Sequence, residues 1–207
     1  PHHPELDKAD IKQAAAYLAQ QANFEQIDSV NWPELFPAKP ATEFIIARSN
    51  SAIFIHYKVH EKQVKAIYTK DQDPVWQDSC VEFFCQLPGA KTYFNFEFNC
   101  IGTCLSTERK SRTEDINPLS AEKTLQIKRY ASLGTEPFEE KKGDFDWQLT
   151  VEIPFSLLKI DTNNLPTHIK ANFYKCGDET SVPHYISWNP IHLENPDFHR
   201  PEFFGEL

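Results

Sequence analysis

Residues 78–102, DSCVEFFCQLPGAKTYFNFEFNCIG, decide the fold of this chain. Two runs of alternating residues, 78–87 and 92–102, are separated by PGAK, in which proline and glycine are typical turn residues. In the second run three phenylalanines alternate with two asparagines and a glutamate, so one face of a strand is apolar and the other is polar. The stretch therefore predicts a β-hairpin with one face in a hydrophobic core.

Residue patterns with the same period recur along the chain, and turn residues separate them. They lie at 43–62, 125–132, 146–158 and 169–178, and Ser49, Asn50 and Ser51 divide the first of them into two strands. No alternation of strands with long helices is present. The sequence predicts a mainly β protein, an antiparallel β-sandwich of the jelly-roll or immunoglobulin-like type.

The N-terminal part differs from the rest. Residues 7–22 place apolar side chains at helical spacing, with Asp7 or Asp10 able to cap the first turn. Residues 31–40 contain three prolines and predict an extended segment. We expect a single domain over 1–207, with one N-terminal helix and the extended segment of 1–40 packed on the sandwich. The polar residues 106–123 predict a long surface loop.

Charge and hydropathy exclude some partners. A net charge of −9 argues against nucleic-acid binding, which requires a clustered basic surface. No apolar run reaches the roughly 20 residues that a membrane span requires, so we expect no membrane contact. No signal peptide is recognisable in this chain, which favours a soluble protein that is cytoplasmic, or periplasmic or secreted if a leader has been removed.

Cysteine and histidine positions do not predict a metal site. The five cysteines have spacings that match no ordinary zinc motif and are expected to be buried free thiols. His184, His192 and His199 lie near Asp197, but on a segment interrupted by prolines, where packing or surface roles are favoured. We expect no cofactor.

Catalytic motifs are also missing. The chain has no nucleophile elbow and no phosphate-binding glycine loop. Glu82, Glu97, Asp78 and Glu152 could supply a carboxylate pair for glycoside hydrolysis, but their separation decides whether they do so.

A sugar-binding site needs a flat aromatic ring beside hydrogen-bonding groups, and Trp76 with Glu82 can supply both. The period of two places Glu82 on the face of its strand opposite Val81 and Phe83, close to the edge at which Trp76 precedes the strand. A rigid strand would then present the carboxylate to a ligand with little loss of entropy.

Two groups of residues resemble the family 9 carbohydrate-binding modules within the wider DOMON-like group of β-sandwiches. The first is VWQDSCVEFF followed by YFNFEFNCIGT. The second is the closing part of the chain, ANFYKCGD, PHYISWNPI and PDFHRPEFFGEL. The resemblance runs from about residue 40 to the end and is closest to single-domain bacterial members.

The resemblance implies non-catalytic binding of a mono-, oligo- or polysaccharide, in carbohydrate catabolism, through a pair of tryptophans and hydrogen-bonding groups. The residues that match these roles are Trp76 and Trp188 as the clamp, Glu82 as the carboxylate, Asn172 or Asn189 as the amide, and Arg109, Arg112 and Lys175 as basic groups.

The family relationship leaves two other functions open. Its members accompany glycoside hydrolases, so an enzyme acting on O-glycosyl bonds is the alternative. Some DOMON-like relatives bind haem, but this chain has no methionine and no clearly placed histidine pair as axial ligands. Related sandwiches can hold structural calcium, for which Asp71, Asp73 and Asp78 are the nearest carboxylates.

Overall fold

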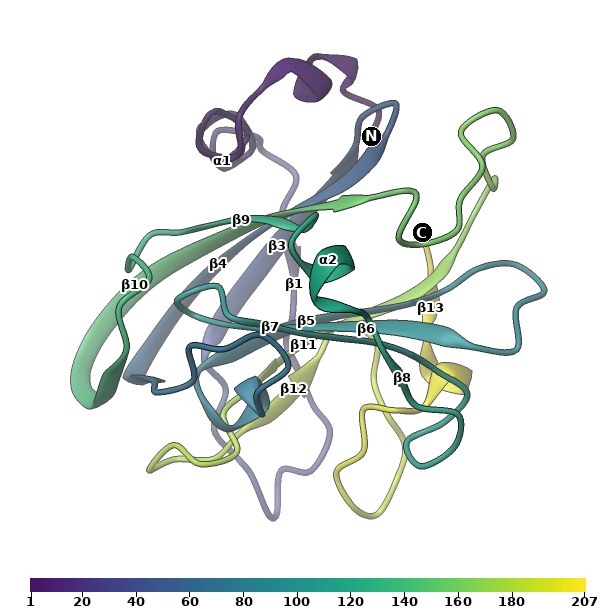
Figure 1. The fold of residues 1–207 in the computed structure, drawn as a ribbon. Helices are drawn as coiled ribbons and strands as arrows, with labels where there is room; N and C mark the ends of the chain where they lie inside the picture. The colour runs from purple at the N-terminus through teal and green to yellow at the C-terminus, as the bar shows by residue number, and fades with distance from the viewer.

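The computed structural model describes residues 1–207, and two antiparallel sheets packed face to face form its body (Figure 1). The five-stranded sheet has the order β1 (Glu25–Gln26), β3 (Ala41–Arg48), β4 (Ala52–Ala66), β10 (Phe138–Pro154) and β9 (Lys128–Ala131). The eight-stranded sheet has the order β2 (Ser29–Val30), β12 (Tyr185–Ser187), β11 (Lys170–Cys176), β5 (Cys80–Gln86), β6 (Tyr93–Asn99), β7 (Cys104–Arg109) and β8 (Asn117–Pro118), with β13 (Gly205–Glu206) also paired to β11. The predicted antiparallel sandwich is confirmed.

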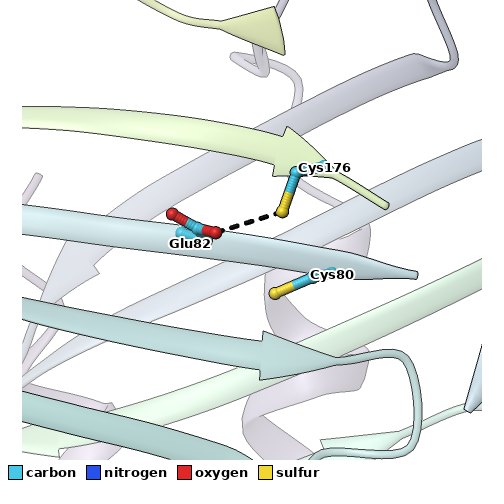
Figure 2. Close-up of side chains that lie close together, drawn as sticks. All are labelled: Cys80, Glu82 and Cys176. Carbon is cyan, nitrogen blue, oxygen red and sulfur yellow. Dashed lines mark hydrogen bonds between the residues drawn. The ribbon is translucent and has the colours of Figure 1, made fainter. Parts of the chain in front are cut away.

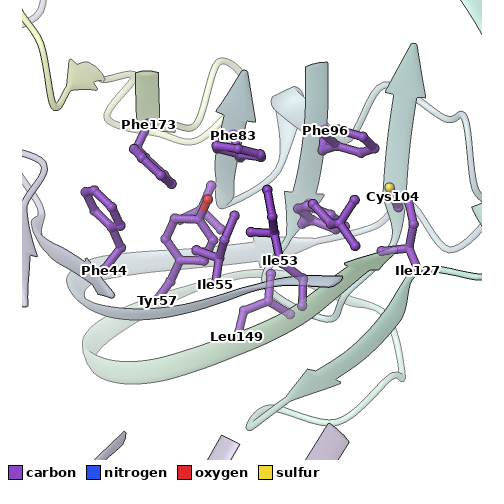
Figure 3. Close-up of a cluster of buried hydrophobic side chains, with 14 of the residues drawn as sticks. Phe44, Ile53, Ile55, Tyr57, Phe83, Phe96, Cys104, Ile127, Leu149 and Phe173 are labelled. Carbon is purple, nitrogen blue, oxygen red and sulfur yellow. The ribbon is translucent and has the colours of Figure 1, made fainter. Parts of the chain in front are cut away.

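Aromatic and aliphatic side chains from the inner faces of both sheets fill the core between them (Figure 3). The predicted hairpin is β5 and β6, and its inner residues Phe83 and Phe96 are directly opposite each other. Phe173 of β11 stacks on Phe44 of β3 with ring centroids 3.7 Å apart, which joins the two sheets. All five cysteines are buried and free, as their spacing predicted.

Two α-helices cover parts of the sandwich. The predicted N-terminal helix is α1 (Ile11–Ala19), and Asp10 caps it by accepting a hydrogen bond from the backbone N–H of Gln13 at 2.8 Å. It packs its buried alanines and Leu18 on the outer face of the five-stranded sheet. The second helix, α2 (Ala121–Thr124), was not predicted. Neither helix is both long and apolar enough to cross a membrane.

The prediction of a surface loop at 106–123 is wrong for its first residues and its last. Strand β7 continues to Arg109, and 117–118 and 121–124 form β8 and α2. The local polarity was misleading because Ser106, Thr107 and Arg109 of β7 are buried and form hydrogen bonds within the protein. The Nε of Arg109, for example, donates to the hydroxyl of Thr107 at 2.7 Å. Pairing with β6 supplies the backbone hydrogen bonds that the residue types do not reveal.

Segments from the N-terminal and C-terminal parts of the chain cover the outer face of the eight-stranded sheet. A second aromatic cluster there contains Trp32, from the predicted extended segment, and Phe204, from the C-terminus, packed on Phe84, Tyr93 and Tyr174 of the sheet. The C-terminal segment thereby buries the polar face of the β5–β6 hairpin, which the sequence pattern alone would place in water. A cavity lies on the same face, with residues 196–199 of the C-terminal segment in its lining.

Candidate functional site

A cavity of 390 Å³ lies on the outer face of the eight-stranded sheet. Four neighbouring strands contribute to its lining: Glu82 comes from β5, Glu97 from β6, Leu105 and Arg109 from β7, and Cys176 from β11. Glu82, Glu97 and Leu105 are cross-strand partners in one row, so their side chains project from the same face. The rigid sheet therefore fixes the positions of these groups.

Loops, strand β12 and the C-terminal segment form the rest of the lining. Trp76 comes from the short 3-10 helix Val75–Gln77, and Asp178 from the turn after β11. Tyr185 comes from β12 and Phe198 from the C-terminal segment. Three aromatic rings and at least two carboxylates thus border one hollow, the combination that a polar ligand with apolar faces requires.

The backbone around Trp76 is held in place from two sides. Its carbonyl oxygen accepts a hydrogen bond from the N–H of Asp178 at 3.1 Å. The carboxylate of Asp78, which ends the 3-10 helix, accepts hydrogen bonds from the backbone N–H groups of Ile67 and Tyr68. The indole of Trp76 is half-buried and borders the cavity, so part of it stays exposed to solvent.

A buried chain of hydrogen bonds links Arg109 to Glu97. Arg109 donates to the hydroxyl of Thr107, which donates to the side-chain oxygen of Asn95. The amide nitrogen of Asn95 in turn donates to Glu97 at 2.7 Å. These residues alternate along β6 and β7, so the strands themselves hold one cation and one carboxylate in fixed positions at the cavity.

Burial changes the ionisation of the cavity's acids. Desolvation, followed by the charge of neighbouring Glu97, raises the pKa of Glu82 well above its usual range. Desolvation also raises the pKa of Glu97 to about 7, although the charge of Arg109 opposes this shift. The same cause raises the pKa of Asp178 to about 6. Burial therefore favours the protonated form of all three carboxyl groups relative to an exposed carboxyl.

The remaining polar residues of the lining come from the loop after β7 and from the C-terminal segment. Arg112 is largely exposed and lies 3.6 Å from a carboxylate oxygen of Asp197. His199 shares a hydrogen bond of 2.9 Å between its Nδ1 and the hydroxyl of Tyr93. Burial, and then the charges of Arg109 and Arg112, lower the pKa of His199 to about 3, so its imidazole is neutral at physiological pH.

Four of the eight residues that the sequence assigned to a sugar site meet in this cavity. Trp76, Glu82, Arg109 and Arg112 all line it. Trp188 does not line the cavity. It lies two residues after Ile186, whose side chain is in the core, so by the alternation of a strand it also points to the inner side of the sheet. There its ring packs edge-on against Phe44 and Phe173, with centroids 5.9 and 5.8 Å away.

The other three assigned residues bond to the protein itself. Asn172 donates to the carbonyl oxygen of Asn189 at 3.1 Å and accepts from its N–H at 2.9 Å, which fixes the segment after β12 to β11. Lys175 lies two residues after Phe173 on β11, so its side chain also points between the sheets. There its Nζ lies 2.9 Å from a carboxylate oxygen of Glu61. None of the three lines the cavity.

The aspartates considered for calcium have partners within the protein. Asp71 forms a bidentate ion pair with Arg129, whose two terminal nitrogens lie 2.7 and 2.9 Å from the two carboxylate oxygens. Asp73 accepts from the backbone N–H of Lys70 at 3.3 Å. Asp78 is fully buried and bonded to backbone groups. The expectation of no cofactor, with structural calcium as the option that the resemblance left open, stays a prediction.

The model of the family described as carbohydrate-binding family 9 matches residues 12–207. This chain belongs to carbohydrate-binding family 9. The match begins earlier than the motif resemblance at residue 40, so the family 9 pattern includes most of the N-terminal helix and the extended segment.

Solved structures resemble this family 9 chain at two levels of similarity. The crystal structure of a candidate carbohydrate-binding protein from Bacteroides uniformis is 39% identical, with a TM-score of 0.88 and coverage of 96% of this chain and 91% of the other. A family 9 module from Caldicellulosiruptor kristjanssonii in complex with glucose is 11% identical, with a TM-score of 0.50 and coverage of 95% and 86%. No curated protein matches the chain.

Sequence reasoning missed several cavity residues of this family 9 protein. Glu97 was considered only as one of four carboxylates for a catalytic pair, and Asp197 and His199 were weighed as metal ligands, with packing or surface roles favoured. Asp178, Tyr185 and Phe198 were not singled out at all. The signal for Glu97 was present, because it lies on the polar face of the hairpin opposite Glu82. For the C-terminal residues no local signal exists, since their position depends on how the segment folds back.

Proposed function

We propose that this family 9 protein binds a carbohydrate, without cleaving it, in the cavity bordered by Trp76. The observation that carries the proposal is the partly exposed indole at the rim of a cavity whose sheet side presents Glu82, Glu97 and Arg109. An indole face contacts the C–H groups of a sugar ring, and the charged and acidic groups bind its hydroxyls. Family membership and the 39% identical relative support this function.

Each group of the cavity has a distinct role in the proposal. Arg109 donates hydrogen bonds to the ligand, because its guanidinium is held at Nε by Thr107 and keeps other N–H groups for a partner. Glu82 and Glu97 bind hydroxyl groups of the ligand through their carboxyl groups. Tyr185 and Phe198, in place of Trp188, provide the further aromatic surface.

The cavity volume limits the ligand. At 390 Å³ it is at the small end of ligand pockets, which measure about 300–1,000 Å³. We therefore propose that one or two sugar units, free or at the end of a longer glycan, occupy it. A role in the breakdown of carbohydrates belongs to the same proposal.

Glycoside hydrolysis is the second candidate, because Glu82 and Glu97 are direct cross-strand neighbours. Hydrolysis needs two carboxyl groups that flank the scissile bond. Here both project from one sheet face, with Cβ atoms about 5 Å apart as in any such pair, so both reach a ligand from the same side. This arrangement favours hydrogen bonding over cleavage.

Haem binding is tested separately, by looking for a Soret band in the absorption spectrum of the purified protein.

Calorimetric titration with glucose, galactose, mannose and cellobiose tests the proposal. We expect at least one sugar to bind, and Trp76→Ala to weaken that binding about 30-fold. This corresponds to about 2 kcal/mol, the loss expected for an aromatic group at the centre of a binding site. Chromatography of the cellobiose mixture after incubation measures cleavage, and we expect none.

A matched pair of variants separates binding from packing. Trp76→Phe and Trp188→Phe make the same change at the cavity and in the core, and only the first is expected to reduce sugar affinity. Equal affinities in both variants, or wild-type affinity in Trp76→Ala, would contradict a site at Trp76.

A further inference from the structure

Two cysteines and a glutamate converge between β5 and β11 (Figure 2). The sulfur atoms of Cys80 and Cys176 and a carboxylate oxygen of Glu82 all lie within 4.8 Å of one another. The thiol of Cys176 donates a hydrogen bond to Glu82 at 3.1 Å. All three side chains are at least nine-tenths buried.

The sheet produces this convergence, and the linear sequence hides it. Cys80 and Cys176 are distant in sequence but are direct partners in the antiparallel pairing of β5 with β11. Glu82 is two residues after Cys80 and therefore projects from the same face. A rigid pair of strands thus holds three potential metal ligands, a set that no short cysteine spacing would indicate.

We propose that Cys80, Cys176 and Glu82 form a binding site for a thiophilic divalent cation, with Zn²⁺ as the natural candidate. Two sulfur ligands and one carboxylate oxygen are ligands that zinc accepts in a tetrahedral site. With bond lengths of about 2.3 Å to sulfur and 2.1 Å to oxygen, such ligand atoms stand roughly 3.5 Å apart. The three atoms, which lie within 4.8 Å of one another, would reach that spacing through rotation of their side chains.

The cavity gives this site an entrance and a fourth ligand position. Cys176 and Glu82 line the cavity, whereas Cys80 is behind them. A cation entering from the cavity would displace to solvent the two thiol protons and any proton on the Glu82 carboxyl, and would keep one position open to water, as in sites with three protein ligands. The hard cation calcium, which takes six to eight oxygen ligands, does not suit two sulfur atoms.

The other three cysteines provide internal controls, since none belongs to the cluster. Cys85 lies on the same strand as Cys80 but on the opposite face, within the core between the sheets. Cys85→Ser therefore makes the same chemical change in the same strand without touching the proposed ligands.

Titration of the reduced, metal-free protein with Co²⁺, followed by Zn²⁺, tests the site without any sugar. We expect thiolate-to-cobalt absorption that saturates at one equivalent and disappears when Zn²⁺ displaces the cobalt. Cys80→Ser and Cys176→Ser should abolish the absorption, Glu82→Gln should weaken binding at least about 10-fold, and Cys85→Ser should bind like the wild type.

Several results would overturn the proposal. They are an absence of thiolate-to-cobalt absorption in the wild type, its persistence in Cys80→Ser, or its loss in Cys85→Ser with the fold intact by circular dichroism. If a serine variant does not fold, Glu82→Gln decides, because it removes one ligand with almost no change in volume. The two proposals share Glu82 but have separate readouts, because the cobalt titration needs no sugar and calorimetry on the metal-free protein needs no cation, so failure of either proposal leaves the other standing.

Discussion

Lys175→Met is expected to lower the free energy of unfolding by about 3–5 kcal/mol, although Lys175 lines no cavity. Its Nζ lies 2.9 Å from Glu61, and both side chains are completely buried. Removal of the lysine leaves a buried carboxylate whose other oxygen still accepts the indole N–H of Trp147, at 2.7 Å. For a domain of this size the loss corresponds to a decrease in Tm of roughly 10 °C.

A neighbouring histidine shows that the site is adapted to a charged lysine. The Nζ of Lys175 donates to Nε2 of His184 at 2.7 Å, and Nδ1 of His184 donates to the carbonyl oxygen of Val182 at 3.0 Å. Burial, and then the charge of Lys175, lower the pKa of His184 to about 3, so the imidazole is neutral and can accept. A neutral methionine offers it no donor.

Denaturant unfolding of three variants checks this prediction. Lys128→Met removes an ion pair of the same length, 2.9 Å to Glu152, but Lys128 is more than half exposed, so the expected loss is below about 1 kcal/mol. The double variant Glu61→Gln/Lys175→Met should recover part of the loss, because no unpaired charge stays buried and Trp147 keeps its acceptor. Equal losses at Lys175 and Lys128 would show that the buried pair has no special role.

Asp78→Ala is expected to destabilise the protein by about 3–5 kcal/mol and to reduce sugar affinity as well. The carboxylate is completely buried and accepts from the N–H of Ile67, the N–H of Tyr68 and the amide of Asn99, at 3.0–3.1 Å. Each donor left unpaired in the interior costs about 1–3 kcal/mol. The same carboxylate fixes the end of the turn that carries Trp76, so the indole would also lose its position.

Unfolding and calorimetry together check the second effect. Asp73→Ala, which removes a single longer hydrogen bond from Lys70 at 3.3 Å, is the control and should change stability by less than about 1 kcal/mol. Asp78→Asn keeps one carbonyl oxygen and should fall between the two. Full sugar affinity in a destabilised but folded Asp78→Ala would show that Trp76 is held by other contacts.

Part of the fold and of the site was predictable from sequence, because it depends on local alternation. The period of two in residues 78–102 specified the β5–β6 hairpin and the face on which Glu82 lies. The same alternation places Lys175 on the inner face with Phe173, and it was available from the predicted strand at 169–178. For Trp188 it required β12, which the sequence did not predict. The motif resemblance assigned both to a ligand, whereas their strands direct them inward.

The sequence by itself determined the antiparallel sandwich, its family and half of the assigned cavity residues, since alternation and short motifs are properties of neighbouring residues. Only the tertiary structure decided which polar groups meet. The C-terminal segment folds back over the polar face of the hairpin and brings Phe198 and His199 to Glu82. Pairing of β5 with β11 places Cys80 beside Cys176. Contacts between residues so distant along the chain depend on strand order and register, which no local pattern specifies.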